Sequence, residues 1–395
     1  HKVAAQAIWR RLMQNGHIYL DKYSGWYSVR DEAYFAENEL IDGKAPTGAP
    51  VEWVEEPSYF FDLSKWQTKL LEFYDENPNF IAPASRRNEV ISFVSSGLRD
   101  LSISRTSFNW GIAVPDDEKH IMYVWLDALT NYITATGFPD EQETLYKKFW
   151  PASLHMVGKD ILRFHAVYWP AFLLAAGLQP PKRVFAHGWW TNEGQKISKS
   201  LGNVIDPIEL VEKYGLDQVR YFLLREVPFG NDGDFSKNSM INRINSDLSN
   251  DLGNLCQRVL SFVQKNCDAS IPQNNGFSKD DERLIAQVYG VLPSLRADFN
   301  SQSFNVALER IWSIVSASNK YIDEQAPWKL RKTEPERMQT VLFTLLETIR
   351  CIGILLQPVM PASANEILNQ LTIDPSDRSF SALNEEHCLQ SGAKL

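Results

Sequence analysis

Apolar residues recur along the chain with the periods of helices and strands, and they divide it into two parts. In residues 1–15, Ala4, Ile8 and Leu12 lie on one face of an expected helix, which ends at Gly16. Short apolar or alternating runs then intermix with helical stretches as far as about residue 190. From about residue 239 onward, nearly all apolar positions keep helical spacing. We therefore expect an α/β part followed by an all-helical part.

The clearest unit is a strand, a helix and a second strand close to the middle of the chain. The pattern predicts a strand at residues 153–157, a helix over 160–176 and a strand at 183–186. Such a unit makes its two strands parallel, and ligands bind beyond the carboxyl ends of parallel strands. Gly158 and His187 each follow one of these strands directly, so we expect both at that edge. Another uninterrupted apolar run, residues 121–125, predicts a strand buried on both faces of a parallel sheet.

The remaining pattern supplies further elements on both sides of this unit. Before it we expect short strands and amphipathic helices, namely strands at residues 19–20, 25–29, 51–54 and 110–115 and helices over 63–75, 86–97 and 126–136. After it we expect helices over 207–214 and 216–225, a loop at 230–235 and an antiparallel helical bundle over about 246–370. One bundle helix has the apolar face Phe304, Leu308, Ile311, Val315, Ser318 and Ile322.

Composition narrows the class of protein. The chain has 395 residues, of which 44% are hydrophobic and 23% charged, so we expect a folded protein of two or three domains. The net charge of −9 counts mildly against nucleic-acid binding, although a local basic patch would suffice for it. No uninterrupted apolar run reaches membrane-spanning length, and no signal-peptide pattern opens the chain. The four cysteines lie far apart without a Cys-x-x-Cys pair, which argues against zinc and disulfides and fits a reducing cytosol.

Residues 187–203 have the chemistry of a phosphate-binding loop. They follow the apolar run Val184-Phe185-Ala186 and contain three glycines, two lysines and two serines. Glycine lets backbone N–H groups approach a ligand, and lysine carries a mobile point charge suited to phosphate. Composition alone favours an ordinary solvated loop, but the order of the residues favours the phosphate site.

Within that segment, Lys196-Ile197-Ser198-Lys199-Ser200 resembles the Lys-Met-Ser-Lys-Ser signature of class I aminoacyl-tRNA synthetases. Its flanks, His-Gly-Trp-Trp-Thr and Leu-Gly-Asn, resemble the methionyl-tRNA synthetase family in particular. Ile197 stands where the family usually has methionine, an exchange of one apolar side chain for another. The resemblance runs from Gly16 to about residue 370 and implies a Rossmann-like parallel-sheet catalytic domain, an inserted connective domain and an all-α anticodon-binding bundle.

The resemblance also implies a division of the chain. We expect a connective insertion over residues 1–108, with the end of the first catalytic half at its start, and the second catalytic half over 109–190. A lysine-loop and tRNA-stem region would follow over 191–245, and the anticodon domain over 246–395. The family's other signature, His-Ile-Gly-His, is absent, since no two of the seven histidines have that spacing. The chain also opens inside a helical pattern without Met. We therefore expect that it lacks the first half of the nucleotide-binding fold and is inactive alone.

Two sets of side chains repeat with helical spacing next to the predicted sheet edge. Trp125, Ala128 and Tyr132 form one face, and Ile161, His165 and Trp169 form another. Aromatic stripes of this kind are more often plain core, and His165 has an equally ordinary interpretation as a satisfied core histidine. An aromatic box with one polar group would however suit a thioether, since sulfur contacts aromatic rings favourably. The resemblance implies that these residues form the methionine pocket.

The resemblance assigns further roles near the sheet edge. Gly158, Lys159 and Asp160 would contact ATP at a helix N-terminus, although Asp160 could equally be a plain helix cap. His187 and Gly188 would lie under the adenine. The phosphates of ATP, which binds together with Mg²⁺, would be contacted by Lys196, Ser198 and above all Lys199. Many relatives carry zinc-binding cysteine pairs in the insertion, but Ser28, Asp31 and residues 45–48 stand there in this chain, so we predict no zinc.

In the helical part, Asn254 and Arg258 share one helix face, and Asp323-Glu324-Gln325-Ala326-Pro327-Trp328 ends another helix. Asparagine and arginine can contact base edges, and an exposed tryptophan can stack on an unpaired base. An ordinary polar face with a tryptophan that caps the bundle is the alternative. By resemblance, Asn254, Arg258, Asp323 and Trp328 would contact the tRNA anticodon.

Together these features predict a cytoplasmic, monomeric methionine–tRNA ligase with L-methionine, ATP and tRNA(Met) as partners and no membrane association. Two alternatives stay open. One is a catalytically silent RNA-binding protein built from synthetase parts, which the intact lysine motif disfavours. The other is a synthetase for a different apolar amino acid, which the aromatic pocket residues and residues 323–328 disfavour.

Overall fold

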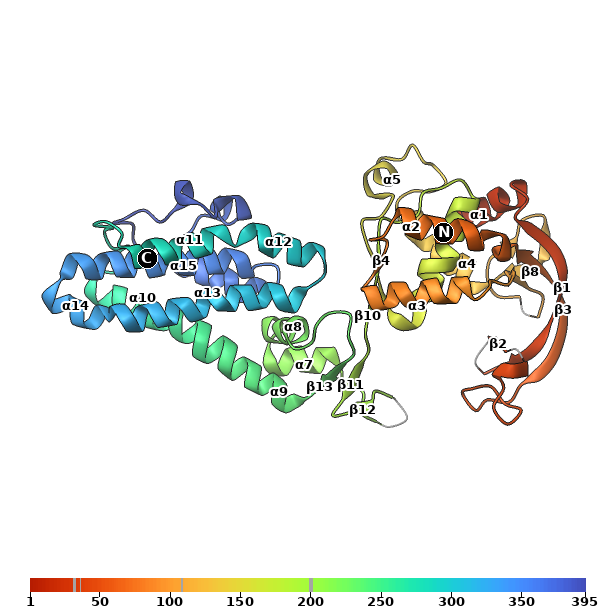
Figure 1. Cartoon of the computed structure of the whole chain (residues 1–395), viewed down its shortest axis with the longest axis horizontal. Helices are drawn as coiled ribbons and strands as arrows, with labels where there is room; N and C mark the ends of the chain where they lie inside the picture. The colour runs from red at the N-terminus through yellow and green to blue at the C-terminus, as the bar shows by residue number, and fades with distance from the viewer. Residues whose placement is uncertain (31–32, 36, 108, 199–201) are drawn as a thin grey trace. The chain divides into compact units, whose positions relative to one another are not determined.

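The computed structural model describes residues 1–30, 33–35, 37–107, 109–198 and 202–395. Its backbone forms two compact units, His1–His187 and Gly188–Leu395. The first unit runs from red to yellow-green in Figure 1, and the second from green to blue. Each unit has its own hydrophobic core, and each is described separately. The α/β first unit and the helical second unit agree with the predicted fold class.

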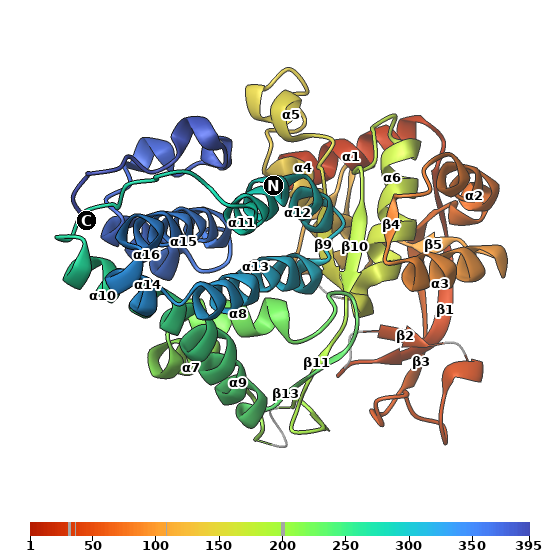
Figure 2. The same cartoon turned by 60° about the vertical axis from the view of Figure 1, so that its left-hand side comes forward.

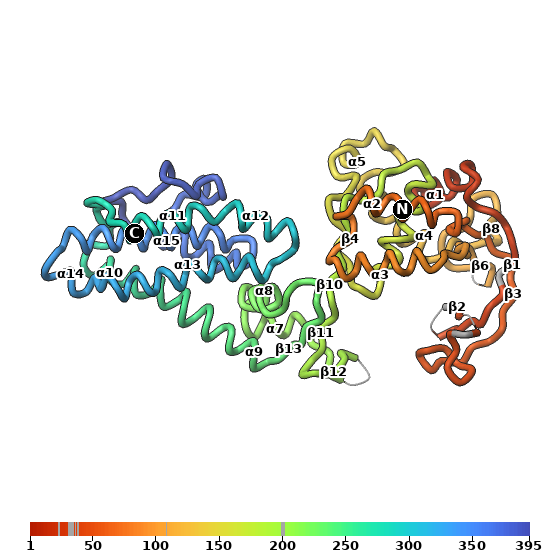
Figure 3. The backbone as a smooth tube through the Cα atoms, viewed as in Figure 1, coloured from red at the N-terminus to blue at the C-terminus, as the bar shows by residue number. Residues whose placement is uncertain are grey.

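The first unit opens with helix α1 (Lys2–Gln14), which buries the predicted face of Ala4, Ile8 and Leu12. An antiparallel sheet in the order β2-β1-β3-β5 follows. Its strands are β1 (Ile18–Ser28), β2 (Ala33–Phe35), β3 (Glu52–Phe61) and β5 (Leu101–Ser102). Strands β1 and β3 pair from Ile18↔Phe61 to Tyr27↔Glu52, and they form the long arm in Figure 3. Sequence had predicted only short segments of this pair.

Helices surround the sheets of the first unit and complete its core. They are η1 (Glu37–Glu39), η2 (Leu63–Trp66), α2 (Gln67–Glu76), α3 (Ala84–Ser95), α4 (Val124–Thr134) and α5 (Thr144–Phe149). The predicted helices over residues 63–75, 86–97 and 126–136 correspond to η2 with α2, to α3 and to α4. Each of these helices buries one side, with Leu70, Val90 and Leu129 in the core.

The predicted strand–helix–strand unit is confirmed. Strands β4 (Ile81–Ala82), β10 (Val184–His187) and β9 (His155–Gly158) form a parallel sheet in that order. The segment between β9 and β10 is helical throughout its first part, as η3 (Lys159–Ile161), the π-helical turn η4 (Phe164–Tyr168) and α6 (Trp169–Ala175). Gly158 and His187 are register partners at the carboxyl ends of β9 and β10, as predicted.

The strand predicted for residues 121–125 is wrong in its type and its end. Strand β8 (Asp117–Met122) pairs antiparallel with β6 (Ser104–Arg105) and β7 (Ala113–Val114). It stops at Met122, since Tyr123 is already the N-terminal cap of α4. An uninterrupted apolar run has neither the period of a strand nor that of a helix, so periodicity could not place this boundary. The predicted strand at 110–115 shrinks to the two residues of β7.

The second unit begins with a small sheet in the order β12-β11-β13. Strands β11 (Trp190–Asn192) and β12 (Gln195–Lys196) form a hairpin, and β13 (Gly233–Phe235) lies parallel to β11. The prediction of a plain loop over residues 230–235 is therefore wrong, because three residues are too few to show alternation. Phe235 packs with Phe222 and Met240 in a small core that joins the sheet to α7 (Pro207–Tyr214), α8 (Leu216–Arg225) and α9 (Lys237–Arg243).

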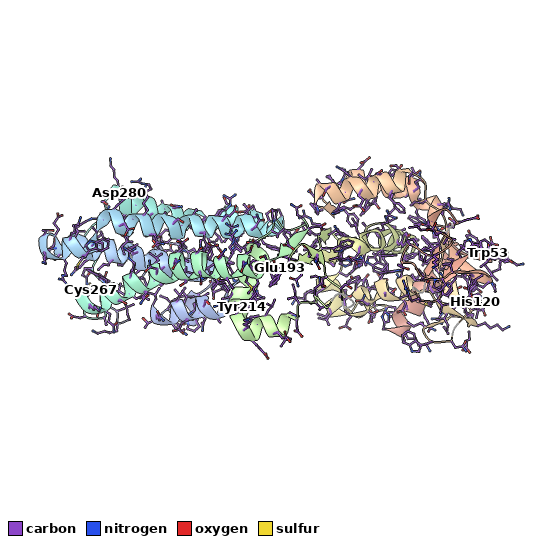
Figure 4. The ribbon with its side chains drawn as sticks, turned by 90° about the horizontal axis from the view of Figure 1, so that it is seen from below. Trp53, His120, Glu193, Tyr214, Cys267 and Asp280 are labelled. Carbon is purple, nitrogen blue, oxygen red and sulfur yellow. The ribbon has the colours of Figure 1, made fainter. Side chains whose placement is uncertain are left out.

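The predicted helical bundle follows. Helix α9 continues through the π-helical η6 (Ile244–Gly253) into α10 (Asn254–Asn266), and Cys267, labelled in Figure 4, caps its end. The other helices are α11 (Lys279–Gly290), α12 (Leu292–Asn300), α13 (Phe304–Gln325), α14 (Pro327–Thr333), α15 (Pro335–Leu356) and α16 (Pro361–Gln370). Helices α11, α13 and α15 run side by side in Figures 1 and 2. The C-terminal tail contains the short turns η7 (Pro375–Asp377), η8 (Phe380–Ala382) and η9 (Glu385–His387).

Helix α15 is long and apolar enough by composition to cross a membrane, with a mean hydropathy of 1.6 in its most apolar window. Its sequence contains no uninterrupted apolar run of that length, because Glu347 and Arg350 lie within the helix. Within the described ranges no other helix passes this test, and 94% of that window is buried inside the bundle. The helix thus fills the centre of the second core, as core helices of globular domains do.

Candidate functional site

The two predicted aromatic faces meet inside the first unit. The indole ring of Trp125 on α4 stacks on Phe164 in the π-helical turn, with ring centroids 3.6 Å apart and an interplanar angle of 10°. Both side chains are half-buried, as are Ala128 and Ile161, whereas Trp169 is fully buried. The structure therefore brings the two predicted faces into contact through Phe164, which is not among the predicted site residues.

Tyr132 and His165 connect the same two faces through a hydrogen bond. His165 is buried, and its Nδ1 lies 2.9 Å from the carbonyl oxygen of Ile161. A carbonyl can only accept, so Nδ1 carries the proton, and Nε2 accepts the hydroxyl hydrogen of Tyr132 at 2.7 Å. Burial lowers the pKa of His165, because it disfavours the charged form of the ring. This geometry fits the ordinary interpretation of a satisfied core histidine, and it also fixes the hydroxyl of Tyr132.

The helix that carries His165 is irregular for a definite reason. Pro170 has no N–H group, so the carbonyl oxygen of Ala166, four residues earlier, loses its usual helical donor. The hydroxyl of Tyr74 on α2 donates to that oxygen at 2.6 Å instead. The π-helical turn Phe164–Tyr168 lies directly before this point. Such turns often accompany functional sites, and here the turn carries both Phe164 and His165.

The predicted nucleotide-binding residues of the first unit gather at the carboxyl ends of β9 and β10. A Cβ atom on Gly158 would lie 2.5 Å from Oδ1 of Asp160, so a side chain there would have to displace that exposed carboxylate. Asp160 is exposed, whereas Lys159 and His187 are half-buried. This edge therefore offers a close backbone approach beside a carboxylate and an imidazole.

Gly188, the next residue along, lies in the second unit and is equally constrained. Its added Cβ would meet the carbonyl oxygen of Asn231 at 2.1 Å. The backbone N–H of the following residue, Trp189, donates to Asp232 at 2.9 Å. The chain after His187 is thus held close to residues 231–232 by contacts that a side chain at position 188 would break.

Hydrogen bonds hold the described residues on both sides of the lysine motif, 189–198 and 202–203. Glu193, labelled in Figure 4, lies in the turn of the β11–β12 hairpin, and its N–H donates to the carbonyl oxygen of Phe235 at 3.0 Å. Asp234 accepts the hydroxyl of Thr191 at 2.5 Å and the N–H of Gly194 at 2.8 Å. These two hydrogen bonds lower the pKa of Asp234. Strand β13 therefore braces the hairpin.

Asn203 closes the lysine motif from its far end. Its amide oxygen accepts from the N–H of Ser198 at 2.8 Å, its amide nitrogen donates to the carbonyl of Lys196 at 3.0 Å, and its own carbonyl accepts from Asn192 at 2.8 Å. Lys196 itself is exposed. The principal predicted residue, Lys199, lies outside the described residues together with Ser200. The sequence analysis missed the role of Asn203, although this asparagine ends the Leu-Gly-Asn flank of the motif.

Three of the four predicted anticodon residues form one cluster on the bundle. The guanidinium of Arg258 donates to Oδ1 of Asp323 at 2.6 Å, and its Cζ lies 5.7 Å from the ring centroid of Trp328. Trp328 is 42% exposed because it follows the left-handed Ala326 and the buried Pro327 at the start of α14. Asn254 is exposed one helical turn before Arg258. The arrangement presents an aromatic face and a guanidinium to solvent, which is what a stacked base requires.

The residues at the zinc positions of relatives do not fit a zinc ion. Ser28 is a buried hydroxyl at the end of β1, residues 45–48 supply no thiolate or imidazole, and Asp31 lies outside the described residues. Within the ranges that the structure describes, no group of three or more His, Cys, Asp or Glu side chains could hold a metal ion. The cysteines, Cys256, Cys267, Cys351 and Cys388, are free thiols of the second unit.

The first unit has a parallel sheet with the predicted nucleotide-binding residues at its carboxyl edge, and the second unit has the lysine hairpin and a helical bundle. These features agree with the class I aminoacyl-tRNA synthetases that the lysine motif resembles. Residues 1–52 and 47–260 match the family described as tRNA synthetases class I (M), and residues 271–395 match the anticodon binding domain of methionyl tRNA ligase. The chain belongs to the methionyl-tRNA synthetase family.

Individual relatives agree with this assignment. Proteins named methionine–tRNA ligase are 57% identical in Rickettsia felis, over 100% of this chain and 78% of the relative, and 56% identical in Brucella suis, over 96% and 75%. A solved structure of Mycobacterium tuberculosis methionyl-tRNA synthetase in complex with methionyl-adenylate has a TM-score of 0.96 at 53% identity, over 100% of this chain and 79% of that one.

Proposed function

We propose that this chain works as a methionine–tRNA ligase, which activates L-methionine with ATP and transfers it to the 3′ end of tRNA(Met). The observation that carries the proposal is the likeness over the whole chain to a methionyl-tRNA synthetase solved with methionyl-adenylate, at 53% identity. The same likeness counts against a synthetase for another apolar amino acid. A silent RNA-binding protein would not need the lysine motif or the paired aromatic faces, which this chain keeps.

In the activation step, the methionine carboxylate attacks the α-phosphorus of ATP, a P–O bond forms, and pyrophosphate leaves with its electron pair. No covalent intermediate with the protein is needed. Catalysis then rests on in-line placement of the two substrates and on positive charge near the leaving oxygens. Mg²⁺ would enter as part of the ATP substrate and neutralise phosphate charge.

The residue roles follow from this chemistry. Lys196, Ser198 and Lys199 would stabilise the phosphates, with Asn203 holding the hairpin ends that carry them. Gly158, Lys159, Asp160, His187 and Gly188 would bind the nucleoside of ATP. Trp125, Ala128, Tyr132, Ile161, His165 and Trp169 would enclose the methionine side chain, since an aromatic box suits a thioether.

The bundle would recognise tRNA. A cation–π contact between Arg258 and Trp328, with Asp323 fixing the guanidinium, presents a face on which an anticodon base could stack. Asn254 would contribute base-edge contacts from the same helix face. We further propose a cytoplasmic monomer without membrane association and without zinc.

Lys199→Ala tests the proposal at its most specific residue. We expect methionine binding, measured by equilibrium dialysis, to stay nearly unchanged, because the lysine acts on the leaving group. Methionine-dependent ATP–pyrophosphate exchange should fall by a factor of about 100 or more, the size of a lost charge contact in the transition state. Lys213→Ala, an exposed lysine on α7, is the matched control. Undiminished exchange in Lys199→Ala would refute the assignment.

A further inference from the structure

His155 is a buried histidine to which the proposed site gives no role. It opens strand β9, and only 4% of its surface is exposed. Its ring stacks on Tyr132, with centroids 4.1 Å apart and an interplanar angle of 30°. Trp150 and His165 pack at its sides, with ring centroids 6.0 and 6.2 Å away. The ring therefore lies directly behind a predicted methionine-pocket residue.

Neither ring nitrogen of His155 has a hydrogen-bond partner in the part of the chain that the structure describes. Buried polar side chains are almost always paired, because losing water without gaining a partner is unfavourable. A leucine or valine in this core position would avoid that cost. What His155 contributes here is therefore the flat face of its ring, which makes its closest ring contact, the one with Tyr132.

The hydrogen bond of Tyr132 holds its ring at the tip, and the face of His155 holds the plane of the ring. Its hydroxyl donates to Nε2 of His165, whose proton on Nδ1 is committed to Ile161. A hydrogen bond at the tip of the ring does not by itself fix rotation about its long axis, and His165 meets the ring only in a T-shaped contact, with centroids 5.6 Å apart. The nearly parallel ring of His155 removes that freedom, since a tilted Tyr132 would lose the stacking contact.

We propose that His155 is a positioning residue for methionine binding, which sets the ring plane of Tyr132 by stacking behind it. This inference rests on the proposed function, since it concerns the same methionine pocket. His155 acts through Tyr132 and does not touch the substrate. If the flat ring of His155 positions Tyr132 and the ring nitrogens do not, a substitution that keeps the ring and one that removes it should have different effects.

The test is steady-state ATP–pyrophosphate exchange with the protein expressed from its complete gene. His155→Phe keeps an aromatic face without nitrogens, and its KM for methionine should stay within about threefold of wild type. His155→Asn keeps polar atoms without a ring, and its KM for methionine should rise roughly five- to tenfold, the range that one aromatic contact supports. In both variants, the KM for ATP and the kcat should change less than twofold.

A second comparison separates positioning from general loss of structure. In a Tyr132→Leu background, His155→Asn should leave the KM for methionine unchanged, because the ring that it positions is gone. A rise as large as in the wild-type background would overturn the inference. So would a His155→Phe variant as impaired as His155→Asn, or equal rises in the KM values for methionine and ATP. If the wild-type protein itself shows no methionine-dependent exchange, the proposed function fails instead.

Discussion

A buried ion pair ties the C-terminal tail to the second unit, and its removal gives a quantitative prediction. Glu347 and Arg350 on α15 are each 1% exposed, with Nη2 of Arg350 2.5 Å from Oε1 of Glu347. Burial opposes the charge on Arg350, but the hydrogen bonds and charge of Glu347 raise its pKa above the ordinary value. Arg350 also donates to the carbonyl of Ala382 at 2.9 Å, and Glu347 accepts the N–H of Leu389 at 3.0 Å.

The magnitude follows from this burial. Glu347→Met leaves the guanidinium of Arg350 buried without its partner, which costs about 3–5 kcal/mol of the free energy of unfolding. In a unit of this size each kcal/mol lowers Tm by about 2–4 °C, so the helical unit should melt roughly 6–20 °C earlier. The double variant Glu347→Met/Arg350→Met should be more stable than Glu347→Met alone by at least about 1 kcal/mol, since no unpaired charge remains.

Differential scanning calorimetry and urea unfolding measure both quantities. Limited proteolysis should cut the tail after residue 372 faster in Glu347→Met, because Leu389 loses its acceptor. The matched control is Glu324→Met, which removes the exposed Lys320–Glu324 pair and should change stability by less than about 1 kcal/mol. A Glu347→Met variant as stable as this control would refute the reasoning. A double variant no more stable than Glu347→Met alone would refute it as well.

Three further predictions follow from other parts of the molecule. Burial beside His165 lowers the pKa of His155 from 6.5 to about 4, so the unfolded chain binds the proton more tightly. The free energy of unfolding, measured with urea, should therefore be highest above pH 6.5 and fall by up to about 3 kcal/mol toward pH 4. His155→Phe should reduce this fall, whereas the control His387→Gln, at an exposed histidine, should not. Asn203→Ala, which frees both ends of the lysine motif, should lower pyrophosphate exchange about tenfold at unchanged Tm, whereas an unchanged rate would mean that the hairpin needs no clamp. Trp328→Ala should weaken tRNA charging about tenfold or more while pyrophosphate exchange persists. The control Trp53→Ala, at an exposed tryptophan on the arm, should not weaken charging in this way, and equal loss of both activities in Trp328→Ala would mark Trp328 as structural.

Much of the fold could be predicted from the sequence, because its longer elements have one buried face. Helix α13 buries Leu308, Ile311 and Val315 as its spacing indicates, and β9 and β10 pair in parallel around a helical crossover. The sequence indicated both ends of α7, because Asp206 caps its start and Gly215, with a positive φ, ends it.

The elements that sequence missed depend on contacts distant in the chain. Strand β13 has three residues and exists because Trp190, Thr191 and Asn192 pair with it some 43 positions away. The end of β8 was misplaced because the apolar residues at 121–125 serve a strand and then a helix. No local period could show either feature.

In the candidate site, too, the sequence identified some residues and missed others. Motif residues such as Gly158 and His187, or Arg258 and Trp328, were found by resemblance, and the structure brings each pair together. Residues that support the site were not found, because a lone histidine in a strand has no sequence signal of its own. The stacking of His155 on Tyr132 appears only once α4 and β9 are packed together.

The most direct test of the proposed function is amino-acid-dependent ATP–pyrophosphate exchange by the protein expressed from its complete gene. Methionine, leucine and cysteine are offered separately with ATP and Mg²⁺, and the exchange rate is compared at equal concentrations. We predict rapid exchange with methionine and at least about 100-fold slower exchange with the other two, because the proposed aromatic pocket would suit an unbranched thioether. Exchange with none of the three, or equally fast exchange with leucine or cysteine, would contradict the account.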